Sequence, residues 1–157
     1  PVCAHAQTKL LTLRCFMNTK GAATSDGSAL DMTISQSGPI TRHYVGQRLS
    51  EIAIHNGTVY LAGQVPENNP QGDMRTQTTE VLGHVERLLL EAGSSKAHIL
   101  SCQIFIRDPK DFDVMNEVWD AWVVPGHTPP RCTVLGPTIH PDWRIEVVVT
   151  AAQITAA

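Results

Sequence analysis

The sequence predicts an α+β domain in which two helices cover one face of a mainly antiparallel sheet. Three observations support this prediction: an Asn-Gly dipeptide between two apolar segments, two amphipathic stretches with helical spacing, and two β-branched segments near the C-terminal end. In chain order the segments read β-β-α-β-α-β-β. This order is typical of one mainly antiparallel sheet with both helices on the same side.

The first two strands are predicted by a hairpin signal. Segments 50–55 (SEIAIH) and 58–62 (TVYLA) flank Asn56-Gly57. A two-residue type I′ turn needs positive φ at both central positions, and these residue types tolerate it. Segment 66–72 (PENNPQG) follows with the composition of a loop.

Two amphipathic stretches predict the helices. Segment 73–92 carries apolar residues on one helix face, and Gly93 ends it. These apolar residues are Val81, Leu82, Val85, Leu88 and Leu89. Segment 109–123 starts with a proline that follows a capping aspartate, and Pro125-Gly126 ends it. Its apolar stripe consists of Phe112, Met115, Trp119 and Trp122. We interpret the tryptophans as core or subunit contacts rather than as a substrate platform.

Three more strands complete the predicted sheet. Segment 98–106 alternates apolar and polar residues, and segments 131–135 and 144–149 are rich in β-branched residues. We expect the last two to form an antiparallel hairpin about the proline-rich turn between them. Segments 104–106 and 147–149 are apolar on both alternations. Two helices cover only one sheet face, so we expect an oligomer to cover the other.

The expected hairpin places two charges on its strands. In that register Glu146 lies opposite Thr133 and diagonal to Arg131. A cation and a carboxylate are costly to bury unless they serve each other or a ligand. The pair is therefore either a structural cross-strand ion pair or a functional site.

Composition excludes several classes of protein and site. The 157 residues suit one domain, the net charge is −3, and Lys and Arg are scattered, so neither nucleic acid nor a membrane is an expected partner. Apolar runs are too short to span a bilayer. Four cysteines without a CxxC pair indicate reduced thiols in a cytoplasmic protein. Seven histidines lack metal-ligand spacing, so no metal is expected.

The N-terminal segment differs from the rest. Residues 1–38 end in a Gly/Ser/Thr-rich stretch of linker composition. We interpret them as an extension: a disordered segment, an artificial addition or the product of an upstream start. A transit peptide is the weaker alternative. Residues 39–157 then form a single domain.

Several ordered motifs resemble the reactive intermediate deaminases, the Rid or YjgF-like (RidA-like) proteins. The resemblance runs over residues 40–153 and rests on segments 56–66 (NGTVYLAGQVP), 115–119 (MNEVW), 130–134 (PRCTV) and 145–147 (IEV). It implies a chorismate-mutase-like fold, a homotrimer with sites between subunits, and no metal or organic cofactor. It also implies hydrolysis of reactive 2-imino and enamine acids of the 2-aminoacrylate type to 2-keto acids and ammonia, as in 2-iminobutanoate/2-iminopropanoate deaminases.

The resemblance assigns roles to individual residues. Arg131 corresponds to the family's essential arginine, whose planar fork suits a substrate carboxylate, and Glu146 is suited to hold the attacking water. Gly63 would bring backbone groups close to the substrate, and Asn116 would bond across the cleft. Thr133 stands where many relatives have cysteine.

One family feature is displaced. The tyrosine usual before the first hairpin has no counterpart at the expected position; Tyr44 lies too far upstream, and Arg48 is a candidate to replace it. Two alternative functions remain: a non-catalytic carboxylate-binding regulatory protein and, less favoured, an endoribonuclease. A deaminase needs both Arg131 and Glu146, whereas a carboxylate sensor needs chiefly the arginine.

Overall fold

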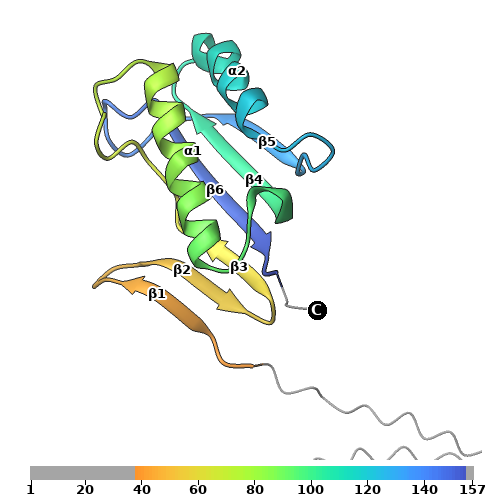
Figure 1. Ribbon diagram of the computed structural model, residues 1–157. Helices are drawn as coiled ribbons and strands as arrows, with labels where there is room; N and C mark the ends of the chain where they lie inside the picture. The colour runs from red at the N-terminus through yellow and green to blue at the C-terminus, as the bar shows by residue number, and fades with distance from the viewer. Residues whose placement is uncertain (1–37, 155–157) are drawn as a thin grey trace, which may run out of the picture. The chain divides into compact units, whose positions relative to one another are not determined.

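The computed structural model describes residues 38–154, and these form a six-stranded sheet with two helices against one face (Figure 1). The strand order is β1-β2-β3-β6-β4-β5, and every neighbouring pair except β4–β5 is antiparallel. The strands are β1 (Thr41–Val45), β2 (Ser50–His55), β3 (Thr58–Leu61), β4 (Ile99–Ile106), β5 (Arg131–Leu135) and β6 (Ile145–Ala152). The helices are α1 (Met74–Glu91) and α2 (Phe112–Trp122), with short 3-10 turns at Lys96–His98 and Pro109–Asp111. The α+β prediction is confirmed.

The predicted first hairpin is present. β2 and β3 pair up to His55 opposite Thr58, and the turn residues Asn56 and Gly57 have φ angles of 48° and 73°. These are the positive values that a type I′ turn requires. Local residue chemistry was therefore sufficient to specify this turn.

The first helix begins and ends as its terminal residues predict, whereas α2 begins three residues later than expected, after a 3-10 turn. The Asp73 carboxylate accepts a hydrogen bond from the Thr76 amide at the start of α1, and Gly93 follows its end with φ 70°. Before α2, the Asp108 carboxylate accepts from the Lys110 amide ahead of the 3-10 turn. The helices pack through apolar stripes onto the same sheet face.

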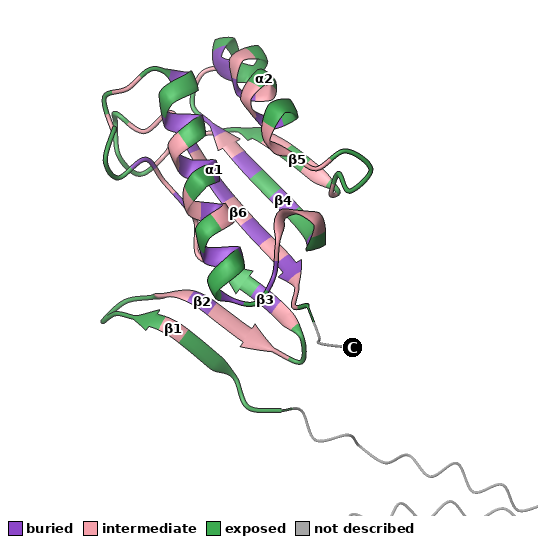
Figure 2. Ribbon diagram, viewed as in Figure 1, coloured by how far each residue is buried: buried purple, intermediate pink, exposed green. Residues whose placement is uncertain are grey.

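The core lies between the helices and the sheet. Along β6 every second side chain is buried, namely Ile145, Val147, Val149 and Ala151 (Figure 2). The predicted buried positions of β4, which are Cys102, Ile104 and Ile106, also face this core. The opposite sheet face has no helix over it, and it carries Tyr60 and Val134 at 50% and 42% exposure. The described chain thus leaves an apolar sheet face uncovered.

The expected closing hairpin is wrong. β5 and β6 are not neighbours, because β4 lies between them and pairs in parallel with β5. The physical reason is α2, which carries the chain back along the sheet between β4 and β5. β5 therefore starts at the same end of the sheet as β4, and the two strands run parallel. β6, apolar on both alternations, takes a central position between β3 and β4.

Two further differences concern the N-terminal side. The structure adds an edge strand, β1, which pairs with β2 and was not predicted. The segment 1–38, interpreted above as an extension, lies outside the described residues except for Gly38. Among the helices of the described chain, none is long and apolar enough to cross a bilayer.

Candidate functional site

Arg131 lies at the start of β5, beneath α2. Its Nη2 donates to Asn116 Oδ1 at 2.8 Å, and Nη1 lies 3.9 Å from the sulfur of Met115. The guanidinium carbon is 4.9 Å from the centroid of the Trp119 ring, a cation–π contact. The side chain is half-buried, and all three contacting residues belong to α2.

All three of these partners are neutral. No ion pair to Arg131 forms within residues 38–154, whereas Arg75, Arg87, Lys96 and Arg144 each pair with a carboxylate. An amide oxygen and an aromatic face orient a guanidinium without cancelling its charge. Arg131 is thus positioned and still has the electrostatic capacity to bind an anion.

Glu146 lies on the other face of the sheet. Its neighbours along β6, Ile145 and Val147, are buried toward the helices, so alternation directs Glu146 away from them. A Cβ built on Gly63 would lie 2.1 Å from Glu146 Oε1, so a larger residue here would push this carboxylate out of its present position. The sequence assigned Gly63 to backbone contact with substrate; the structure shows it making space for Glu146.

Arg131 and Glu146 therefore do not face each other within one chain, contrary to the register expected above. Glu146 pairs with Phe105 of β4, and Phe105 pairs with Val134 rather than Thr133. The two charges lie two strands apart, roughly 10 Å across the sheet, and on opposite faces. The interpretation as a cross-strand ion pair is wrong.

Asn116 and Thr133 lie close to Arg131. Asn116 is its hydrogen-bond acceptor, and Thr133 follows two positions along β5 on the same face. The Thr133 hydroxyl is buried and has no hydrogen-bond partner among the described residues. Such an unpaired buried polar atom is unusual in proteins.

Tyr44 and Arg48 lie at the other edge of the sheet. The Tyr44 hydroxyl donates to Glu91 Oε2 at 2.6 Å, and this bond raises the pKa of Tyr44 and lowers the pKa of Glu91. Tyr44 also has φ 53°, uncommon for a residue with a side chain. Arg48 is exposed between β1 and β2. Within one chain the sheet order separates both residues from Arg131 on β5.

Trp119 is the feature that sequence reasoning missed. It is 5% exposed, as its assignment to the core predicted, but one ring face also carries Arg131. Its other aromatic contact is Trp122, with ring centroids 5.4 Å apart. A helical stripe of aromatic residues predicts burial and gives no sign of which cation will stack on them.

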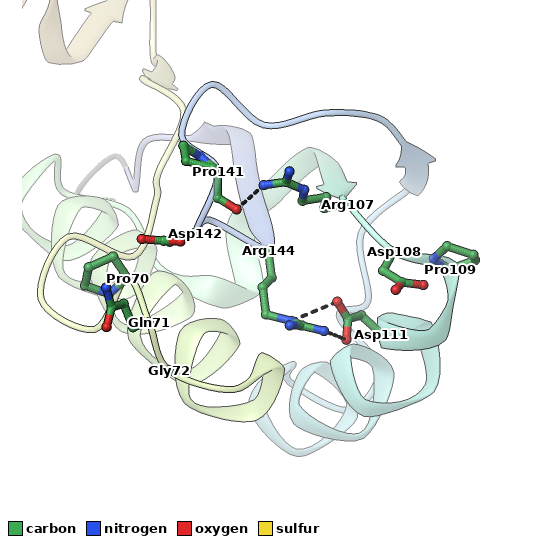
Figure 3. A pocket seen from close by; sticks show the side chains of 10 residues that line it. All are labelled: Pro70, Gln71, Gly72, Arg107, Asp108, Pro109, Asp111, Pro141, Asp142 and Arg144. Atoms are coloured by element: carbon green, nitrogen blue, oxygen red, sulfur yellow. Dashed lines mark hydrogen bonds and ion pairs between the residues drawn. The ribbon is translucent and has the colours of Figure 1, made fainter.

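A second polar region surrounds a cavity of about 700 Å³ at the end of the sheet (Figure 3). Arg144 donates to both Asp111 oxygens, at 3.0 and 2.7 Å, and Arg107 bonds the carbonyl of Pro141. The Asp111 bond raises the pKa of Arg144. Asp111 thus neutralises Arg144, and Arg107 is held by a backbone carbonyl, so we interpret this region as structural.

Metal ligation and thiol chemistry find little support in the described residues. Within that part of the chain no three His, Cys, Asp or Glu side chains converge on one point. Burial raises the pKa of Cys102 to about 12, which keeps this thiol protonated and inert at neutral pH. Cys132, on the opposite side of β5 from Arg131, is exposed.

Comparison with known proteins agrees with the fold. A family model described as Endoribonuclease L-PSP matches residues 40–153. A RutC family protein of Haemophilus influenzae is 44% identical over 112 residues, which cover 71% of this chain and 97% of that protein. The 3-aminoacrylate deaminase RutC of Acinetobacter baylyi is 35% identical over 98 residues, 59% of this chain and 77% of its own.

A solved structure gives the same result in three dimensions. The crystal structure of a member of the YjgF protein family from Neisseria meningitidis superposes with a TM-score of 0.72 at 42% identity, covering 75% of this chain and 98% of that one. The matched region includes every strand and helix described above. The chain therefore belongs to the Endoribonuclease L-PSP family of Rid, YjgF and RutC proteins.

Proposed function

We propose that the protein is a hydrolytic deaminase that converts 2-imino and enamine acids to 2-keto acids and ammonia. The observation that carries the proposal is the state of Arg131, which three neutral groups orient and no described carboxylate neutralises. A guanidinium in that state suits the carboxylate of an imino acid. The relative named 3-aminoacrylate deaminase supports the reaction class.

The chemistry needs two functional groups. Arg131 binds the substrate carboxylate and so fixes the adjacent C=N carbon. Glu146 accepts a proton from a water molecule as the water oxygen bonds to that carbon, and returns it as the C–N bond breaks. An iminium and a water molecule thus give a ketone and an ammonium ion, with atoms and charge balanced. An enamine first takes up a proton at its terminal carbon.

We further propose that these two groups meet between chains of a chorismate-mutase-like homotrimer. Within one chain they lie on opposite sheet faces, so a single chain does not hold both against one substrate. The uncovered sheet face carries Tyr60, Phe105 and Val134, an apolar surface suited to self-association. Arg131 of one chain would then act with Glu146 and Gly63 of the next.

The activity is tested with 2-iminopropanoate generated by an amino-acid oxidase, with the remaining imine trapped by semicarbazide. We expect Arg131→Ala to lower kcat/KM by at least about 100-fold, because the carboxylate clamp is lost. Glu146→Gln should lower kcat by about 100-fold, because the water loses its base. Arg87→Ala removes an exposed cation on α1 and is the matched control. Equal rates in all variants would sink the proposal.

Sharing between chains has its own test. Arg131→Ala and Glu146→Gln chains, unfolded and refolded together, should regain about a quarter of wild-type activity, because random assembly restores intact pairs at some interfaces. Each variant refolded alone remains inactive. If the mixture stays inactive while native mass spectrometry confirms mixed oligomers, the site does not span two chains. A monomer in sedimentation would contradict the assembly directly.

The alternatives make different predictions. A carboxylate-binding regulator would bind 2-keto acids through Arg131 and be indifferent to Glu146→Gln. For the ribonuclease activity in the family's name, we expect a basic surface. Four cations of the described chain are instead paired one by one with acids, namely Arg75–Glu117, Arg87–Glu91, Lys96–Glu86 and Arg144–Asp111.

A further inference from the structure

An apolar cavity lies between β5 and α2, further along the strand from Arg131. Arg131, Thr133 and Leu135 alternate onto the same face of β5, so Thr133 and Leu135 lie roughly 7 and 13 Å from Arg131 along the strand. On α2, Phe112 precedes Asn116 by one helical turn, roughly 6 Å. Since Asn116 accepts a hydrogen bond from Arg131, both elements lead from Arg131 toward the cavity.

The lining of this cavity is almost entirely apolar. Its volume is about 290 Å³, and it is lined by Ile106, Pro109, Phe112, Thr133 and Leu135. Ile106 is 3% exposed and forms the floor, whereas Phe112 and Leu135 remain 42% and 59% exposed at the rim. A cavity of about 150 Å³ already admits benzene, so this one has room for an isobutyl or phenyl group.

We infer that this cavity is the side-chain subsite of the enzyme, and that the preferred substrates are 2-imino acids with branched or aromatic apolar side chains. The inference rests on the proposed function, because it takes Arg131 as the carboxylate clamp. The carbon chain of a leucine- or phenylalanine-derived imino acid extends several ångströms from its carboxylate, a length comparable with the roughly 7 Å between Arg131 and Thr133, the cavity-lining residue next to it on this face of the strand. The three-carbon imino acid has only a methyl group and leaves the cavity empty.

The distribution of polar groups supports this occupant. Arg131 is the cation beside the cavity, and Thr133 is the single side chain with a hydroxyl among the residues that line it. A polar anchor beside an apolar cavity is the usual design of a small-molecule site. Filling the cavity would also cover the rim side chains Phe112 and Leu135, which are exposed in the isolated chain.

The test uses stable 2-keto acid products as binding probes, measured by calorimetry on the full chain. We expect 4-methyl-2-oxopentanoate to bind about tenfold more tightly than pyruvate, because three further apolar carbons are buried. Leu135→Ser should reduce this ratio to about twofold. Leu90→Ser is the matched control, because Leu90 has a similar exposure of 62% but lies on α1. Both leucines are exposed, so neither change removes a core residue.

The same pair is then compared as imines generated from leucine and alanine. A higher kcat/KM for the leucine-derived imine, lost in Leu135→Ser and kept in Leu90→Ser, supports the subsite. Equal affinities for the two keto acids, or a preference unaffected by Leu135→Ser, overturns it even if both imines are hydrolysed. If neither imine is hydrolysed but the binding preference and its loss in Leu135→Ser persist, catalysis fails and the apolar subsite stands.

Discussion

Arg131 and Arg144 are both half-buried arginines next to strands of one sheet, but their surroundings differ. Arg144 donates to both oxygens of Asp111, a carboxylate that is 9% exposed, and its amide donates to Gln77. Arg131 rests against an amide, a thioether and an indole. One arginine completes a closed network, and the other is held in place with its charge uncompensated.

The difference separates a structural cation, Arg144, from Arg131, the cation that we propose to be functional. A buried carboxylate needs its cation, so removal of Arg144 leaves an uncompensated charge in the protein. Neutral partners make no such demand, and the folded chain loses little when Arg131 is removed. The cavity beside Arg144 is the larger of the two discussed, but its two arginines already bind Asp111 and the carbonyl of Pro141 (Figure 3). Cavity size is thus a poorer guide to the site than the pairing of its charges.

The largest effect on stability is expected at Arg144. Arg144→Met should lower the free energy of unfolding by about 2 to 3 kcal/mol, below the range for a fully buried pair because this side chain is 41% exposed. Arg131→Met, the matched change, should alter it by less than about 1 kcal/mol and still abolish imine hydrolysis. Urea unfolding of both variants measures the comparison. Equal destabilisation would remove the distinction between the two arginines.

Gln77 is fully buried and belongs to the same closed network as Arg144. Its side-chain nitrogen donates to the carbonyls of Pro70, Gly72 and Asp142 at 2.7 to 3.1 Å, and its oxygen accepts from the Arg144 amide at 2.8 Å. Gln77→Leu should cost about 2 kcal/mol, because these backbone groups lose a partner and only some regain water.

The control for Gln77 is Gln71, which is exposed on the loop whose carbonyls Gln77 binds. Gln71→Leu should leave the urea midpoint almost unchanged. A Gln77→Leu protein as stable as the Gln71→Leu protein would mean that the two loops hold together without this side chain. In that event the closed network would owe its rigidity to the Arg144–Asp111 pair alone.

Sequence reasoning succeeded where the physical cause is local. The Asn56-Gly57 turn, the capping of α1 by Asp73 and the apolar stripe of α2 each follow from residues a few positions apart. The predicted pairing of the two closing strands was wrong, because strand pairing there depends on the α2 crossover and on which strand takes the centre of the sheet. β1 was missed because an exposed edge strand has little apolar alternation.

The candidate site divides in the same way. Residue type and family resemblance selected Arg131 and Asn116, and the structure brings these two into contact. The supposed partner Glu146 was placed by an assumed register, and the real register moves it to the opposite face. The stacking of Trp119 on Arg131 depends on how α2 lies over β5, which no spacing within the sequence encodes.

The smallest expected effect concerns Asp73, which begins α1 beside the closed network. Its carboxylate accepts a bond from the Thr76 amide at 2.8 Å, and this bond lowers the pKa of Asp73 in the folded chain. A lowered folded pKa means that the ionised cap stabilises the protein above the unfolded pKa and ceases to do so as pH falls through the folded value. Asp73→Asn keeps a neutral acceptor at every pH. Wild type should therefore exceed the Asn variant in urea midpoint at pH 7, and this advantage should shrink in acid; an unchanged gap would show that the negative charge of the cap contributes nothing.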